Sequence, residues 1–127
     1  MKDQVQRSFV AIANGPNGGV VATYQFTADL PVFIGHFPNA PIVPGVFLIE
    51  SVRSAIERHR AAQFSIVSVD EAKFLGPVLP GDSVEVCAHI VQEHSSIRCV
   101  ADLRTGDAVV ARIKLRLRDL VTSEAGP

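Results

Sequence analysis

Apolar and polar residues alternate along the second half of the chain with the period of two that is typical of half-buried β-strands. Ser83–Gln92 and Ile97–Leu103 are two such segments, and Phe64–Phe74 is a further run rich in apolar residues. The clearest alternation is in the final segment, whose apolar members are Val109, Ala111, Ile113, Leu115 and Leu117 and whose basic members are Arg112, Lys114, Arg116 and Arg118. Turn residues separate these segments, so the pattern predicts four strands.

The first half of the chain has a different pattern. Ser8–Ala13 and Val20–Phe26 are apolar runs separated by the Asn- and Gly-rich residues 14–19, which predicts a β-hairpin. Ala28–Gly45 holds four of the eight prolines and is expected to be a rigid, irregular loop. Val46–Arg60 is expected to be a helix, buried in its first half because the residues there are apolar on all sides.

The order of these elements is two strands, one apolar helix and four strands. Because strands and helices do not alternate, a parallel α/β sheet is excluded, and an α+β domain with an antiparallel sheet is expected. The length of 127 residues fits a single domain over residues 1–127.

Composition narrows the class of protein further. Hydrophobic residues make up 47% of the chain and the net charge is −1, which argues against a disordered chain and against a nucleic-acid binder. Cys87 and Cys99 are interpreted as small core residues of a reduced, cytoplasmic protein. The two long uncharged stretches are broken by Gly, Asn or Pro, so neither a membrane span nor a secretory signal is expected.

Candidate chemistry is concentrated in residues 36–50. His36 lies in the proline-rich loop, Pro44-Gly45 marks the start of the helix, and Glu50 follows four apolar residues. Alone, His36 could pack in the loop and Glu50 could pair with Arg53 at a spacing of three, a contact worth about 0.2–0.5 kcal/mol. A carboxylate on a buried helix is costly without a use, however, which favours a functional site.

This stretch resembles the hot-dog-fold 3-hydroxyacyl-(acyl carrier protein) dehydratases of fatty-acid synthesis. The matching residues are Gly35-His36-Phe37-Pro38, Pro41-Ile42-Val43-Pro44-Gly45-Val46 and Glu50. The resemblance implies an antiparallel sheet of about six strands around one central helix. It also implies a homodimer, alone or as a trimer of dimers, in which each site takes its His from one protomer and its acidic residue from the other.

The resemblance further implies dehydration of a 3-hydroxyacyl thioester to the trans-2-enoyl thioester, without metal or cofactor. His36 would remove the C2 proton, Glu50 would protonate the departing hydroxyl, and the backbone at Gly45 and Val46 would bind the thioester carbonyl. An acid role near neutral pH requires Glu50 to stay protonated, so we expect Arg53 to point away from it.

The chain departs from the family pattern at Asn39, where Gly is usual, and at Arg53 and Ser54, where the family often has Ala-Gln.

Two alternatives to the dehydratase are a hot-dog thioesterase and a non-catalytic acyl-binding subunit. The basic row Arg112, Lys114, Arg116 and Arg118 is expected to be either a solvated face or a docking surface for acyl carrier protein. His89 and His94 are not expected to bind a metal, because no further ligand accompanies them.

Overall fold

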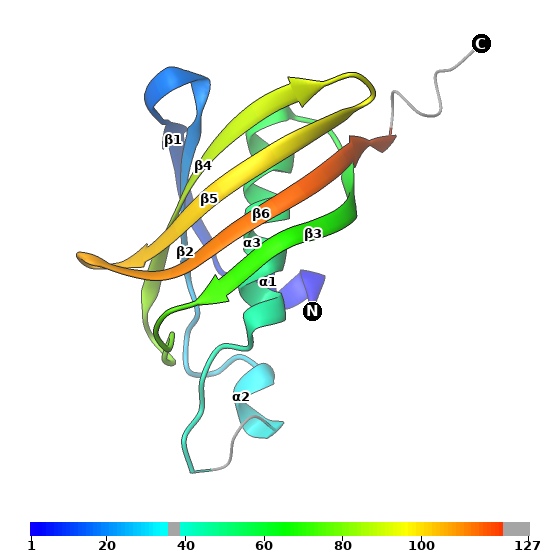
Figure 1. The fold of residues 1–127 in the computed structure, drawn as a ribbon. Coiled ribbons are helices and arrows are strands. Elements are labelled where there is room, and N and C mark those ends of the chain that lie inside the picture. Colours follow the sequence, from blue (N-terminus) through cyan, green and yellow to red (C-terminus); the bar gives the residue numbers. More distant parts are fainter. Residues whose placement is uncertain (36–38, 121–127) are drawn as a thin grey trace.

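The computed structural model describes residues 1–35 and 39–120 as a curved antiparallel sheet around one helix (Figure 1). The strands are β1 (Phe9–Asn14), β2 (Val20–Gln25), β3 (Phe64–Phe74), β4 (Ser83–Glu93), β5 (Ser96–Thr105) and β6 (Ala108–Asp119). The helical elements are α1 (Lys2–Arg7), the 3-10 turn η1 (Pro16–Gly18), α2 (Val32–Gly35) and α3 (Gly45–Arg60). The α+β prediction is confirmed.

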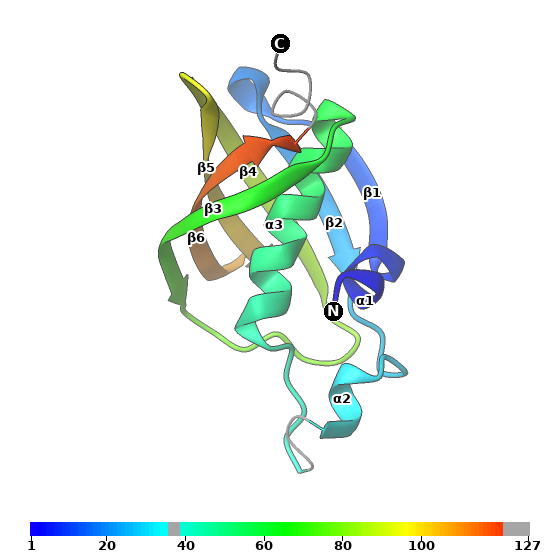
Figure 2. The same ribbon diagram turned by 90° about the vertical axis from the view of Figure 1, so that its right-hand side faces the viewer.

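The six strands follow the order β1-β2-β4-β5-β6-β3, and every neighbouring pair is antiparallel. The sheet bends around α3, so that β1 and β3, its two edge strands, come to opposite sides of the helix (Figure 2). This arrangement, a sheet wrapped around a central helix, is the one that the resemblance implied.

The alternation along β4, β5 and β6 separates a buried face from an exposed face, as predicted. The buried face includes Val84, Val86, Ala88, Ile97, Cys99, Ala101, Leu103, Ala111, Ile113, Leu115 and Leu117. These side chains share the core with Val52, Ala55 and Ile56 of α3, none of which is exposed to solvent. Burying one such aliphatic side chain contributes about 1.5–3 kcal/mol, so the helix is held mainly by apolar packing.

The two cysteines differ, and the prediction is right for only one of them. Cys99 is fully buried on the inner face of β5. Cys87 is only half-buried, because it lies between the inward-facing Val86 and Ala88 of β4 and therefore points to the other face of the sheet.

Helix α3 begins at Gly45, as expected, after Pro44 in an extended conformation. It ends at Arg60, and the capping residue Ala61 adopts the left-handed conformation. Arg58, His59 and Arg60 lie near the negative end of the helix dipole. The expectation that its first turn is buried on all sides is wrong for Val46, which is 56% exposed.

Two short helices were not predicted. Helix α1 buries Val5 completely, and α2 lies inside the segment that was expected to be irregular. The Oε1 atom of Gln4 accepts a hydrogen bond of 2.9 Å from the backbone N–H of Val32, so α1 fixes the first turn of α2. Helices this short contain too few residues for a periodic apolar pattern.

Candidate active site

The start of α3 is held by the last residue of β3 and by the connection between β3 and β4. The backbone N–H of Val43 donates to the carbonyl of Val78 at 2.8 Å, which fixes the segment before the helix. The ring of Phe74 packs on Gly45 so closely that a Cβ there would lie 2.6 Å from its Cζ atom. Because the first N–H groups of a helix have no intrahelical acceptor, this glycine-faced helix start suits a carbonyl that gains negative charge.

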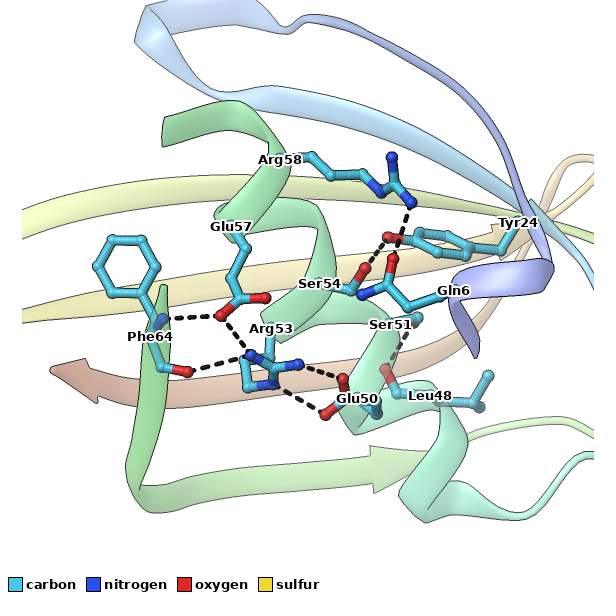
Figure 3. A network of polar contacts seen from close by, with 10 residues as sticks. All are labelled: Gln6, Tyr24, Leu48, Glu50, Ser51, Arg53, Ser54, Glu57, Arg58 and Phe64. Atoms are coloured by element: carbon cyan, nitrogen blue, oxygen red, sulfur yellow. Dashed lines mark hydrogen bonds and ion pairs between the residues drawn. The ribbon is translucent and has the colours of Figure 1, made fainter. Parts of the chain in front are cut away.

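Glu50 lies further along the same helix and is almost completely enclosed. It lies five positions after Gly45, a rise of about 7–8 Å along the helix axis. Its residue is 3% exposed, and both carboxylate oxygens contact Arg53 (Figure 3). The Nε atom of Arg53 donates to Oε1 at 2.9 Å and Nη2 donates to Oε2 at 2.5 Å.

This geometry corrects the expectation that Arg53 points away from Glu50. A buried carboxylate needs a partner charge, and the planar guanidinium supplies two parallel donors from the next turn of the helix. The pairing at a spacing of three is therefore a buried, two-pronged ion pair, with Arg53 itself 5% exposed. It counts against Glu50 as the proton donor, because the contact stabilises the charged carboxylate.

The same guanidinium also ties α3 to β3. Its Nη1 atom contacts Oε2 of Glu57 at 2.5 Å and donates to the backbone carbonyl of Phe64 at 3.0 Å. The Phe64 N–H in turn donates to Oε2 of Glu57 at 2.8 Å. The hydrogen bond to Glu50 raises the pKa of Arg53, against the opposite effect of burial, so the guanidinium stays charged.

Ser54, a departure from the family pattern, takes part in a second buried contact. The hydroxyl of Tyr24 donates to Ser54 Oγ at 2.7 Å, and both residues are fully buried (Figure 3). Burial raises the pKa of Tyr24. Sequence reasoning missed this pair, although Tyr24 is the single tyrosine of the chain and occupies an inward position of a predicted strand.

His36 lies outside the described residues, so its predicted role as base stays a prediction. Asn39, where the chain departs from the family pattern in the same loop, is exposed. Within residues 1–35 and 39–120, no three His, Cys, Asp or Glu side chains gather as metal ligands would. No helix in that part of the chain has the length and apolar character needed to cross a membrane.

The basic row on β6 lies on the outer face of the sheet and is partly neutralised. Arg112 pairs with Asp102 of β5 at 3.5 Å, and Arg116 pairs with Glu93 of β4 at 3.0 Å. Lys114 and Arg118 make no ion pair with another described residue. Fewer basic side chains on this face are therefore left without an ion pair to a described residue than the sequence suggests.

Comparison with known proteins places this site in a family. Residues 13–111 match the model of the ApeI-like family, described as ApeI dehydratase. A 3-hydroxyacyl-[acyl-carrier-protein] dehydratase FabZ of Haemophilus influenzae (strain PittEE) is 34% identical over 98 residues, which are 71% of this chain and 66% of that protein. A protein of the same name from Ehrlichia ruminantium (strain Gardel) is 33% identical over 87 residues, 61% of this chain and 60% of that protein. The match therefore spans less than two thirds of the length of either relative.

A solved structure confirms the hot-dog fold. The dehydratase heterocomplex ApeI:P from Xenorhabdus doucetiae superposes with a TM-score of 0.71 at 23% identity, over 87% of this chain and 96% of that chain. The family model begins at Ala13, where the first predicted strand ends. It covers the rest of the hairpin, the block from Gly35 to Glu50, and the sheet as far as Ala111. The chain belongs to the ApeI-like dehydratase family.

Proposed function

We propose that this protein dehydrates a 3-hydroxyacyl thioester carried on acyl carrier protein to the trans-2-enoyl thioester. The observation that carries the proposal is that the block from Gly35 to Glu50 lies within the region matched by the dehydratase family model. Glu50 occupies a buried position on the central helix, and a helix start without side-chain bulk precedes it.

The proposed reaction breaks the C2–H and C3–O bonds and releases water. His36 takes the C2 proton, and the electron pair moves into an enolate on the thioester carbonyl. When the enolate collapses, the C3–O bond breaks and the hydroxyl leaves as water with the proton that His36 returns. The Gly45 N–H, next to Val46 at the start of α3, donates to that oxygen. A preorganised donor of this kind lowers the barrier by about 3–4 kcal/mol. A placed base contributes about 10²–10⁴ in rate.

One assay tests this function against the thioesterase alternative. The protein is incubated with a 3-hydroxyacyl carrier thioester while enoyl absorbance and free thiol are followed together. We expect enoyl product without thiol, and a loss of about 10²–10⁴ in rate for His36→Ala. Thiol release would instead identify a thioesterase. The absence of both products would contradict catalysis by this chain.

A second candidate function is that of a non-catalytic acyl-binding subunit. The specific observation in its favour is the closed ion pair of Glu50 with Arg53, which leaves the carboxylate little exposed. Inactivity of the isolated chain, together with recovery of activity only after a catalytic homologue is added, would support this candidate.

We propose Lys114 and Arg118 as the part of the basic row that contacts acyl carrier protein. Their charges are not consumed by ion pairs with other described residues, whereas those of Arg112 and Arg116 are. Charge reversal at both positions is expected to raise KM for carrier-bound substrate and to spare a pantetheine thioester. Unchanged KM for the carrier substrate at low salt would contradict this docking site.

We further propose that the sites are shared across a homodimer. Support comes from the family resemblance and from exposed apolar residues on the edge strand β3, which include Val67, Val69 and Phe74. When His36→Ala and Glu50→Ala protomers are mixed under exchange conditions, part of the activity is expected to return. No recovery in proven mixed dimers would argue against shared sites.

A further inference from the structure

One guanidinium serves two separate groups of acceptors in the buried network of α3. Among the described residues, the Nε and Nη2 atoms of Arg53 contact only Glu50, whereas Nη1 contacts Glu57 and the carbonyl of Phe64 (Figure 3). The contact between α3 and β3 therefore uses only the Nη1 atom of the guanidinium. The other two donor positions are given entirely to Glu50.

Stability alone does not account for the half of this network that holds Glu50. Desolvation of a buried ion pair costs about as much as the pair returns, and apolar residues of the same volume often serve equally well. The tie to β3 does not need Glu50, because Glu57 and Phe64 make it without that carboxylate. The contact of Arg53 with Glu50 thus calls for a role at Glu50 itself.

We propose that Arg53 is a positioning residue that holds Glu50 ionised and oriented, so that Glu50 accepts a hydrogen bond from the substrate hydroxyl instead of protonating it. This inference rests on the proposed function. Each carboxylate oxygen has about two acceptor positions. Arg53 occupies one on each oxygen, and no other side chain or backbone group in residues 1–35 and 39–120 donates to the second. An ionised carboxylate has no proton to give.

The proton balance of the reaction is then met by one group. The base that removes the proton from C2 returns it to the C3 oxygen as the C–O bond breaks, and water leaves. Glu50 orients the hydroxyl and carries the same charge before and after the step. No additional acid or oxidant is required.

The surroundings of Glu50 support a fixed charge. On its own helix the charged neighbours are Arg53 and Glu57, and β3 contributes the backbone carbonyl and N–H of Phe64. From β2, the neutral hydroxyl of Tyr24 faces this region and donates to Ser54. Arg53 is thus shared between two carboxylates, whereas the Tyr24 hydroxyl is bonded to Ser54.

The charge on Glu50 can be tested without measuring turnover. An infrared difference spectrum between wild type and Glu50→Gln isolates this carboxyl. At neutral pH we expect ionised carboxylate bands in wild type and in the matched control Glu57→Gln, which leaves both contacts to Glu50. In Arg53→Met we expect the band of a protonated carboxyl. A protonated Glu50 in wild type would overturn the proposal.

Kinetics then test the positioning role. Arg53→Met is expected to lose about 10²-fold in kcat on enoyl formation, since small misplacements of a site group cost that much, with little change in KM. Arg53→Lys keeps the charge without the two-pronged contact and is expected to recover part of that rate. Should Arg53→Met fail to fold, the wild-type spectrum and Arg53→Lys still decide. Equal kcat in Arg53→Lys and wild type would overturn the positioning role.

These outcomes are separable from failure of the proposed function. If wild type forms no enoyl product, the dehydratase proposal fails, and the role of Glu50 as an acceptor in dehydration falls with it. If wild type is active and Glu50 is protonated, only the inference about Arg53 fails.

Discussion

At the scale of single residues, Gly45 shows how a missing side chain shapes the candidate site. The ring of Phe74 occupies the place where a Cβ would stand, 2.6 Å from its Cζ atom. The ring is half exposed and can move, so a larger residue at this position would displace it and not the backbone. The free energy of this contact can therefore be measured by substituting Gly45 and Phe74, alone and together.

We expect Gly45→Ala to cost only about 1 kcal/mol of unfolding free energy, the low end of the range for overpacking, because the half-exposed ring of Phe74 can give way. In a Phe74→Ala background the clash is absent, and the same change is expected to stabilise the helix by up to about 1 kcal/mol. Urea unfolding of the four proteins gives the coupling between the two positions. Equal effects of Gly45→Ala in the two backgrounds would contradict the observed contact.

The cysteines give a second prediction at this scale, one that depends on pH. Burial raises the pKa of the Cys99 thiol to about 12, whereas an unfolded thiol titrates near about 8.5. Between these values the folded state holds a proton that the unfolded state has lost. Stability contributed by the neutral thiol is therefore present below about pH 8.5 and falls by about 1.4 kcal/mol per pH unit above it.

Urea unfolding between about pH 9 and pH 10 is expected to show this decrease of the unfolding free energy with pH. Cys99→Ala is expected to remove the part of the decrease that Cys99 causes. Thiol labelling of the folded protein supplies the control, with the half-buried Cys87 modified before Cys99. Labelling of Cys99 at the rate of Cys87 would be inconsistent with its burial.

The block from Gly35 to Glu50 could be recognised in the sequence, but the state of Glu50 could not. A Glu and an Arg at a spacing of three describe an exposed pair as well as a buried one, and the two differ several-fold in energy. Only the tertiary structure places Arg53 between two carboxylates and a strand carbonyl. The correction at Arg53 is therefore a consequence of burial, which local spacing does not encode.

At the scale of elements, the network around Arg53 determines where β3 starts relative to α3. Glu57 accepts from the Phe64 N–H and pairs with Arg53, so one carboxylate joins the end of the helix to the first residue of the strand. The connection between the two elements is only residues 61–63, which leaves this contact to fix their angle.

We expect Glu57→Gln to lower the unfolding free energy by about 1.5–3 kcal/mol, the usual range for a hydrogen bond to a charged group. Amide exchange at Phe64 is expected to accelerate at the same time. Glu71→Gln is the matched control: its 3.7 Å contact with Lys73 is exposed and is expected to contribute about 0–1 kcal/mol. Similar losses in the two variants would show that burial adds nothing to the Glu57 contact.

The long elements were predictable and the short ones were not. Strands β4 to β6 repeat a two-residue alternation over ten residues or more, because one face of each meets the helix. Helices α1 and α2 hold six and four residues, and their positions depend on tertiary contacts such as Gln4 with Val32. Their formation depends on the folded sheet more than on local preference.

At the scale of the whole molecule, the sheet has two open edges and each displays apolar residues. On β1 these include Val10 and Ile12, and on β3 they include Val67 and Val69. An unpaired edge can add a strand from a second chain. Of the two edges, β3 is longer and ends at Phe74, which packs on the helix start at Gly45. A partner on β3 would therefore lie next to the candidate site, as shared sites require.

Val69→Lys is expected to shift the proposed dimer toward monomer, because pairing two copies of β3 would bring the new charges together in a desolvated contact. Sedimentation equilibrium over a series of protein concentrations measures the shift. Ile12→Lys places the same charge on an exposed β-branched position of β1 and is expected to leave the mass unchanged. Dissociation by Ile12→Lys alone would move the interface to the far edge of the sheet. There a second copy could not supply a residue next to Gly45, so shared sites would be excluded together with the β3 interface.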